Sequence, residues 1–522
     1  LGLVREDNAA KQSVIDRLGQ ELGLVREDNA AKQSAVQRLV AELDERVGKV
    51  RELEGLCHTS IGRAGDLARR LHRKDQVLAL TSSTLVDYRS MFGGTLELAY
   101  RSRRMPGRLT DGGRYVGSTR ADSATRRRIG MDVMSIQFGV SGGVEVYMRT
   151  LVQALMTLEG IGVVLLCLES QLESLRKSFG AEVAYYVYGS RPMLRSAKRL
   201  DARIHRRVDV ETVERVPASF ARLREDAGVQ ILHCPVQCYS LFDFNVPAVF
   251  HLHDLQHLHF PENFRPSDVE ARNHYYGLSA DLSDVVVATS DYIRDDIVSK
   301  MHVPSEKVVR IPATWDPKVE AGLASFSPED ARRTYRLPPL FGLFPAQFWP
   351  HKNHARLVEA LAIVRSRLPD VDFKLVFTGN RAHSGWPKVA ETIERLGLQD
   401  HVLCLDYVPV GHLAALYKCA AFCVMPSTFE ASSYPVIEAQ LFGCPSMCSN
   451  VTSLPELMRD GAGLLFDAYD VDDMAAQMLR WLRDPDDAAA HAERAAVKVR
   501  REHGMDSYAA GIADVYQRMV PL

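Results

Sequence analysis

The sequence predicts an α/β protein with two doubly wound parallel sheets that face a cleft, preceded by an α-helical coiled coil. From Ile129 onward, short apolar segments alternate with segments of helical periodicity, in two successive series. This alternation is typical of parallel sheets covered by helices on both faces. A chain of 522 residues also exceeds what one hydrophobic core usually organises, which indicates several domains.

An internal repeat begins the chain. The segment LGLVREDNAAKQS occupies residues 1–13 and recurs at 22–34, three heptads later. With Leu1 at heptad position a, most a and d positions are apolar, and Asn8 and Asn29 fall at a. Such a pattern predicts a coiled coil, and asparagine at a favours two strands. We therefore expect residues 1–105 to form a helical coiled coil that makes a homo-oligomer. A lone amphipathic helix packed on the body is the alternative.

Residues 106–128 differ from both flanks, because Gly, Ser, Thr and Arg dominate after Pro106. This composition predicts a basic linker without regular structure. A basic arm that touches anionic lipid head groups is the alternative.

Composition narrows the classes of partner and compartment. A net charge of −2 indicates no nucleic-acid partner. No apolar run approaches the roughly 18 residues of a membrane-spanning helix, and no apolar signal core begins the chain. The nine cysteines lack the CxxC spacing of zinc sites, so we expect reduced thiols. We expect a cytoplasmic protein, with contact to the inner face of the cell membrane or to a partner enzyme left open.

The first α/β series covers residues 129–335. Its first strand, 129–138, precedes Gly142 and Gly143 and a helix over 144–158. Glycines at such a turn let backbone N–H groups approach a phosphate or sugar at a helix N-terminus. Further strands are expected near 162–169, 229–235, 248–255, 285–290 and 308–312, and helices near 191–206, 217–227, 267–282 and 291–300.

A histidine-rich loop follows the strand at 248–255. It contains His251, His253, His257 and His259, together with Asp254. The spacing matches no HExxH-type metal site, and no cysteine completes one. We therefore interpret the loop as a polar edge of the sheet, with His253 and Asp254 facing a ligand.

The second α/β series covers residues 336–504, and a last helix in 505–522 is expected to cross back to the first domain. Its strands are expected near 341–348, 373–379, 402–408, 420–425, 446–450 and 463–467. Its helices are expected near 355–367, 386–396, 411–419, 471–483 and 485–502.

Two carboxylates mark the stretch from 426 to 456. Glu430 follows the strand at 420–425, and Glu438 lies eight positions later, in a helix that begins near Pro435. A carboxylate at the end of a strand and another in the next helix face the crevice where open α/β sheets bind ligands.

These motifs resemble the retaining GT-B glycosyltransferases of family 4, also called glycosyl transferases group 1. The resemblance covers about 129–520 and rests on two Rossmann-like units with Glu430-x7-Glu438 late in the second, beside SNVTSLPE at 449–456. The segments HDLQHLHFPENF and PAQFWPHKNH are similar to those of bacterial mannosyltransferases that build surface polysaccharides.

The resemblance implies a role for each matching residue. Glu438 matches the glutamate that bonds the ribose hydroxyls of the nucleotide, and Glu430 the one that meets hydroxyls of the transferred sugar. Lys352 matches the lysine that neutralises the diphosphate, and His253 the histidine near the reacting sugar.

Backbone groups complete the implied donor site. Those around Ser432, Ser433 and Tyr434 are expected to line the phosphate or sugar, opposite the loop of Gly142 and Gly143.

Two positions depart from the family pattern. Gln347 stands where the family often has an arginine, five residues before the lysine, and EASSYP at 430–435 replaces EGFGLP. We interpret both as marks of a subfamily. His351, Asn353 and His354 are candidates to compensate for the missing cation.

The resemblance implies a metal-independent hexosyltransferase without a cofactor. The favoured reaction moves mannose from GDP-mannose to a growing, lipid-linked glycan of the O-antigen type. A UDP- or dTDP-sugar donor is one alternative. A coiled-coil assembly protein with an inactive transferase body is another.

Overall fold

The computed structural model describes residues 114–118, 126–136, 143–188, 219–220, 223–242 and 246–520. Every described residue belongs to one compact unit, Pro106–Leu522. The coiled coil predicted for 1–105 lies outside the described residues, as does Gly142.

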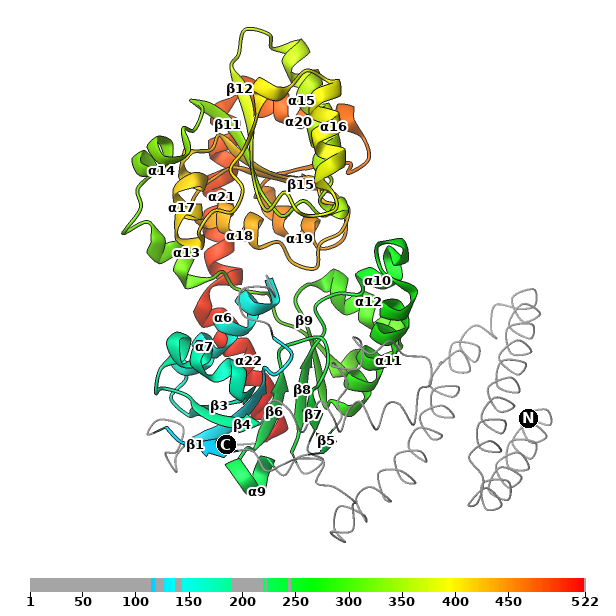
Figure 1. Ribbon diagram of the computed structural model, residues 1–522, viewed down its shortest axis with the longest axis vertical. Coiled ribbons are helices and arrows are strands. Elements are labelled where there is room, and N and C mark those ends of the chain that lie inside the picture. The colour runs from blue at the N-terminus through cyan, green and yellow to red at the C-terminus, as the bar shows by residue number, and fades with distance from the viewer. Residues whose placement is uncertain are drawn as a thin grey trace, which may run out of the picture. The chain divides into compact units, whose positions relative to one another are not determined.

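The first sheet has eight strands in the described part of the chain, in the order β1-β4-β3-β2-β6-β8-β9-β10 (Figure 1). Neighbouring strands are parallel, except that β1 and β4 are antiparallel. The strands are β1 (Arg114–Val116), β2 (Arg127–Asp132), β3 (Ile161–Leu168), β4 (Ala184–Tyr188), β6 (Ile231–Cys234), β8 (Ala248–His251), β9 (Val285–Ala288) and β10 (Val308–Arg310). Because β2 pairs with β3 on one side and β6 on the other, the chain order reverses at β2, where such sheets bind ligands.

Helices follow most of these strands. The helix after β2, α6 (Gly143–Thr157), buries one face with three- and four-residue spacing, formed by Tyr147, Met148, Leu151, Val152 and Leu155. This spacing makes the helix amphipathic and seats it on the sheet. The others are α7 (Glu169–Phe179), α9 (Leu223–Ala227), α10 (Gln256–His259), α11 (Pro266–Leu282) and α12 (Asp291–Met301). Two short strands, β5 (Ser219–Phe220) and β7 (Leu241–Phe242), pair separately.

The second sheet has six parallel strands in the described residues, in the order β13-β12-β11-β14-β15-β16. They are β11 (Leu340–Pro345), β12 (Phe373–Thr378), β13 (Val402–Cys404), β14 (Phe422–Met425), β15 (Ser446–Ser449) and β16 (Leu464–Phe466). Its central strand β11 pairs with β12 and β14, so the chain order reverses between β11 and β14. The loops after these two strands therefore share one edge.

The helices of the second sheet alternate with its strands (Figure 1). They are α13 (Pro317–Gly322), α14 (Pro328–Tyr335), α15 (His354–Arg367), α16 (Trp386–Arg395), α17 (Val410–Cys419), α18 (Tyr434–Leu441), α19 (Leu454–Met458), α20 (Val471–Arg483) and α21 (Pro485–His503). A single 3₁₀ turn, η5 (Pro350–Lys352), lies between β11 and α15.

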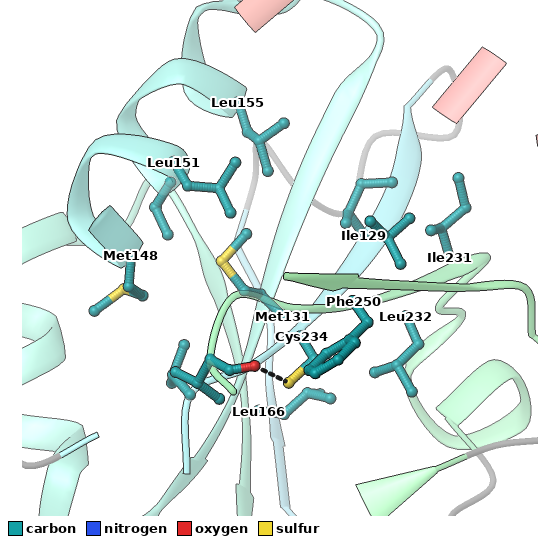
Figure 2. Close-up of a cluster of buried hydrophobic side chains, with 14 of the residues drawn as sticks. Ile129, Met131, Met148, Leu151, Leu155, Leu166, Ile231, Leu232, Cys234 and Phe250 are labelled. Atoms are coloured by element: carbon teal, nitrogen blue, oxygen red, sulfur yellow. Dashed lines mark hydrogen bonds between the residues drawn. The ribbon is translucent and has the colours of Figure 1, made fainter. Parts of the chain in front are cut away.

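Each sheet has its own hydrophobic core. In the first, Ile129 and Met131 of β2 lie among Leu166, Phe250 and residues of α6, all fully buried (Figure 2). Burying one such side chain contributes roughly 1.5–3 kcal/mol. The neighbouring strand β3 (IGVVLLCL) is apolar along its whole length because helices cover both faces of a parallel sheet.

The last helix, α22 (Met505–Met519), packs on the first core, where Tyr508, Ile512 and Tyr516 are buried. The preceding helix, α21, contributes Val499 to the second core. The end of the chain thus joins both sheets.

The division between the two sheets differs from the predicted boundary at 335/336. Trp315, Val319 and Ala331 lie in the second core, although the sequence assigns residues up to 335 to the first domain. Helices α13 and α14 are short amphipathic segments, and their local pattern does not indicate which sheet they cover.

The prediction of an unstructured linker over 106–128 is wrong where the structure describes it. Arg114–Val116 forms β1, and β2 already begins at Arg127. Tyr115 and Val116 pack against the first core, which gives this edge strand partners that composition does not reveal.

Three further expectations need correction. The helix predicted over 217–227 consists of β5 and the short α9. The strand predicted over 248–255 ends at His251, because the Asp254 carboxylate accepts a hydrogen bond from the backbone N–H of Gln256 and turns the chain. The strand β4 and helix α7 were not predicted. Among the described residues, no helix is long and apolar enough to span a membrane.

Candidate active site

Lys352 and Glu430 form an ion pair at the reversal point of the second sheet. Lys352 follows β11 and Glu430 follows β14, which are adjacent parallel strands. Lys352 Nζ lies 2.6 Å from Glu430 Oε1, and the two side chains are 19% and 8% exposed. The sheet topology thus brings together two residues that lie 78 positions apart.

Glu430 is held by its neighbours on three sides. The Ser427 hydroxyl donates to Glu430 Oε1 at 2.7 Å, Thr452 Oγ1 accepts from the Glu430 N–H at 3.0 Å, and Ser453 Oγ donates to the Glu430 carbonyl at 2.9 Å. Because Oε1 takes both side-chain bonds, Oε2 has no protein partner among the described residues. The carboxylate can therefore accept a hydrogen bond from a ligand hydroxyl.

Lys352 is the last residue of a turn that hydrogen bonds tie to two other loops. Asn353 has the left-handed φ of 63°, and its Nδ2 donates to the carbonyls of Pro426 at 2.9 Å and Ala468 at 2.8 Å. The Thr428 N–H donates to the His351 carbonyl at 2.8 Å. These bonds fix the loop after β11 against the loop after β14, so the ion pair has little freedom.

Glu438 lies further along α18 and is buried. The Tyr417 hydroxyl donates to Glu438 Oε2 at 2.9 Å. The pKa of Glu438 is raised to about 8, mainly by burial and also by the nearby Asp316 carboxylate, while the Tyr417 hydrogen bond opposes the change. This carboxyl therefore holds a proton at neutral pH.

The N-terminus of α18 carries polar atoms without partners. Ser433 is 1% exposed, and neither its Oγ nor the buried hydroxyl of Tyr434 has a hydrogen-bond partner among the residues that the structure describes. An unpaired buried polar group costs about 1–3 kcal/mol, so such groups usually meet a ligand or water. Backbone N–H groups at a helix start also favour anions. Ser432 lies half-buried in the loop just before them.

The first sheet contributes Gly143 to the same place. A Cβ built on Gly143, the first residue of α6, would lie 4.0 Å from Tyr434 Cε2. The N-termini of α6 and α18 are therefore neighbours, as the sequence predicts for the glycine loop and the glutamate stretch.

His253 lies beside α6 and is neutral. Its ring meets the Tyr147 ring edge-on, with centroids 4.6 Å apart. His253 Nε2 lies 2.8 Å from the Pro235 carbonyl, which can only accept, so Nε2 holds the proton and Nδ1 is an acceptor. Burial lowers the pKa of His253.

The other histidines of this loop have separate partners. The Tyr147 hydroxyl bonds His251, which stacks on His233, while His257 bonds Asn273 and His259 bonds Asp296 at 2.7 Å. Each ring thus has a structural contact of its own.

Gln347 does not take the place of a cation. Its Oε1 accepts from the Asn380 N–H at 2.7 Å and holds the loop after β12. Of the three residues suggested as compensation, Asn353 fastens loops, and His354 packs on Phe344, where burial lowers the pKa of its imidazole to about 3. Burial and Lys352 lower the pKa of His351 to about 4, whereas Glu430 and Asp254 raise it. His351 is therefore neutral.

Sequence reasoning missed the residues that hold the two glutamates. Ser427, Thr452 and Tyr417 are common polar residues whose contacts span 3, 22 and 21 positions. Ser427 comes two residues after a buried strand, which is a usable signal, but nothing local marks Tyr417.

Both α/β domains match families of known proteins. Residues 330–498 match the family of Glycosyl transferases group 1, and residues 141–318 match Glycosyltransferase Family 4. The O-antigen chain mannosyltransferase B of Escherichia coli is 30% identical over 248 residues, 45% of this chain and 61% of the relative. A D-inositol 3-phosphate glycosyltransferase of Streptomyces bingchenggensis is 31% identical over 253 residues, 45% of this chain and 52% of the relative. The chain thus spans little more than half the length of these relatives.

A solved structure agrees in fold. Anabaena HepE, in complex with UDP and glucose, has a TM-score of 0.56 and 16% identity, and the match covers 75% of this chain and all of that one. The two α/β domains of this chain therefore match the two domains of GT-B glycosyltransferases, the first through Glycosyltransferase Family 4 and the second through Glycosyl transferases group 1.

Proposed function

We propose that this protein transfers a hexose from a nucleotide sugar to a glycan acceptor. The observation that carries the proposal is the Lys352–Glu430 pair, fixed at the reversal point of a parallel sheet. Beside it, the start of α18 presents buried polar atoms that have no partner within the described ranges. A cation, helix N–H groups and a carboxylate with one open oxygen suit a sugar diphosphate.

In this proposal, each residue meets one part of the donor. Lys352 and the start of α18 around Ser432–Tyr434 bind the diphosphate, together with the Gly142–Gly143 loop. Glu430 Oε2 accepts from a hydroxyl of the transferred sugar, and His253 faces that sugar. Glu438 binds the ribose hydroxyls, for which its Oε1 has no protein partner among the described residues.

We propose a retaining, front-face reaction. The acceptor oxygen bonds the anomeric carbon, the bond from that carbon to phosphate oxygen breaks, and the acceptor proton passes to the departing phosphate. Lys352 and the positive end of α18 stabilise the developing negative charge, an effect often worth a few kcal/mol per donor. We propose that no metal ion or cofactor is needed to stabilise this negative charge. Turnover that EDTA abolishes and Mg²⁺ restores would contradict this part.

The favoured donor is GDP-mannose, and the favoured acceptor is a growing, lipid-linked glycan of the O-antigen type. The similarity to an O-antigen chain mannosyltransferase supports this choice. The similarity in fold to a protein crystallised with UDP and glucose supports a UDP-sugar as the second candidate.

Thermal unfolding with GDP, UDP and dTDP distinguishes these donors. A nucleotide at 100 times its dissociation constant stabilises the fold by roughly 2.7 kcal/mol. We expect GDP to raise the melting temperature most, and GDP-mannose to be turned over with a glycan acceptor. A shift with UDP alone would overturn the mannose assignment. No shift and no turnover with any donor would overturn the transferase proposal.

A further inference from the structure

Asp254 lies in the loop after β8 and is held in a defined orientation. Its Oδ1 accepts a hydrogen bond from the Gln256 N–H at 3.0 Å, and its Oδ2 accepts from Gln237 Nε2 at 3.2 Å. The Tyr276 hydroxyl of α11 donates to Gln237 Oε1 at 2.6 Å. Because a carboxylate cannot donate, Gln237 must turn its NH₂ group to Asp254 and its oxygen to Tyr276. The three side chains therefore form a relay of hydrogen bonds with one direction, in which Tyr276 donates to Gln237 and Gln237 donates to Asp254.

The loop that carries Asp254 borders the Lys352–Glu430 pair. His259 and Phe260, five and six residues after Asp254, contact the ring of Phe429, with centroids 5.3 and 6.1 Å apart. Phe429 directly precedes Glu430. His351, which directly precedes Lys352, is influenced electrostatically by both Glu430 and Asp254. The loop that carries Asp254 thus adjoins, from the first sheet, the site that the second sheet builds.

The charge of Asp254 has no structural partner. It is half-buried, and it forms no ion pair with any residue among the described ranges. Its two hydrogen bonds come from neutral donors. An asparagine, which has one side-chain oxygen, could therefore keep part of this arrangement. Each carboxylate oxygen keeps a second lone pair for another donor. A charged acceptor at this position suits a ligand rich in hydroxyl groups, since hydrogen bonds to charged groups are the stronger ones.

We propose that Asp254 binds the attacking hydroxyl of a carbohydrate acceptor, and that Gln237 is its positioning residue. The inference rests on the proposed transferase function and adds the acceptor side of the same site. Asp254 accepts a hydrogen bond and directs the hydroxyl oxygen at the anomeric carbon. The proton of that hydroxyl passes to the departing phosphate oxygen, so Asp254 does not take up a proton in this step.

Kinetics of the whole chain with GDP-mannose and mannobiose test the proposal, with UDP-glucose as a second donor. We expect Asp254→Asn to lower kcat/KM for mannobiose about 10- to 100-fold, the loss of one hydrogen bond to a charged group. Donor affinity by calorimetry and donor hydrolysis without acceptor should stay within about twofold of the unaltered chain. The matched control is Asp268→Asn, which changes a half-buried carboxylate of the same domain paired with Arg265.

Variants of the relay separate positioning from folding. Gln237→Ala and Tyr276→Phe should raise the KM for mannobiose by a factor several times larger than the factor by which they lower kcat. Donor affinity should not change. Gln237→Asn, whose amide is shorter, should rescue only part of the loss.

The outcomes distinguish the two proposals. The role of Asp254 would be overturned if Asp254→Asn lowered donor affinity as much as kcat/KM for mannobiose, or if it lowered neither. Continued hydrolysis of the donor would still support the proposed transferase function in that case. No donor binding and no turnover by the unaltered chain would overturn both.

Discussion

Glu456 Oε1 accepts a hydrogen bond from the backbone N–H of Tyr292 at 2.8 Å, and its Oε2 accepts from the Asp291 N–H at 3.0 Å. A side chain of α19, in the second sheet, thus caps the N-terminus of α12, beside the first sheet. A carboxylate suits this position because helix N-termini carry unsatisfied N–H groups and a partial positive charge.

Removing this cap should destabilise the protein. Replacing a capping side chain usually costs about 0.5–2 kcal/mol. We expect Glu456→Ala to lower the free energy of unfolding by about 1–2 kcal/mol in urea titrations. The control is Glu320→Ala, whose exposed carboxylate lies 3.8 Å from Arg500 and should contribute little. Equal effects of the two substitutions would contradict the cap.

Lys352→Met should weaken binding of the diphosphate more than binding of the nucleoside. Lys352 is the cation at the candidate phosphate position, so its removal should raise the dissociation constant of GDP about 10- to 100-fold and leave guanosine unchanged. Calorimetry with both ligands measures the difference. A parallel loss for guanosine would indicate a general collapse of the site.

Glu430→Ala should abolish transfer while the fold persists. We expect turnover to fall at least about 100-fold, because an interaction with the reacting sugar is lost. The Ser427 hydroxyl then loses one acceptor, so a small decrease in melting temperature is expected as well. Turnover by a folded Glu430→Ala variant would contradict the role of Glu430. If the unaltered chain itself shows no turnover, the alternative of an inactive assembly protein is favoured.

Tyr434→Phe should leave the ligand-free protein as stable as before, since the buried Tyr434 hydroxyl has no partner in the described part of the chain. The same change should raise the dissociation constant of the sugar nucleotide severalfold. Tyr239→Phe is the contrasting control, because the Tyr239 hydroxyl donates to the Val249 carbonyl at 3.0 Å and its loss should lower the melting temperature. Melting curves and calorimetry on both variants test the pair.

Glu438 should make stability depend on pH. Its pKa is raised from 4.5 to about 8, so the folded state binds the proton more tightly than the unfolded state. The resulting stabilisation is fully present below pH 4.5 and is lost as pH rises through 8. About 1.4 kcal/mol accompanies each pKa unit, so the loss amounts to at most about 5 kcal/mol.

Urea titrations between pH 5 and 9 should therefore show a decline that Glu438→Gln removes. Glu391→Gln, at an exposed residue paired with Lys388, should keep the decline. The same decline in both variants would place its cause elsewhere.

The repeat at 1–34 should make the chain oligomeric. We expect light scattering to report a dimer or higher oligomer for the whole chain, and a smaller species after deletion of residues 1–57. A monomer that this deletion leaves unchanged would refute the coiled-coil prediction.

The alternation of apolar and amphipathic segments predicted most elements of both sheets to within a few residues. It also placed Lys352 and Glu430 after strands, because carboxyl ends of parallel strands share an edge. The pattern failed at Arg114–Val116 and at 217–227, where segments are short and contacts with distant strands decide the conformation.

What the sequence alone determined is local: where strands and helices form, and which polar residues follow them. Only the tertiary structure decided that Tyr417 meets Glu438, that Gln347 engages Asn380, and that Tyr276 aligns Gln237 with Asp254. Periodicity records which face of a segment is buried, whereas these contacts join residues 17 to 39 positions apart. They depend on strand order and on the packing of each helix, which no local pattern specifies.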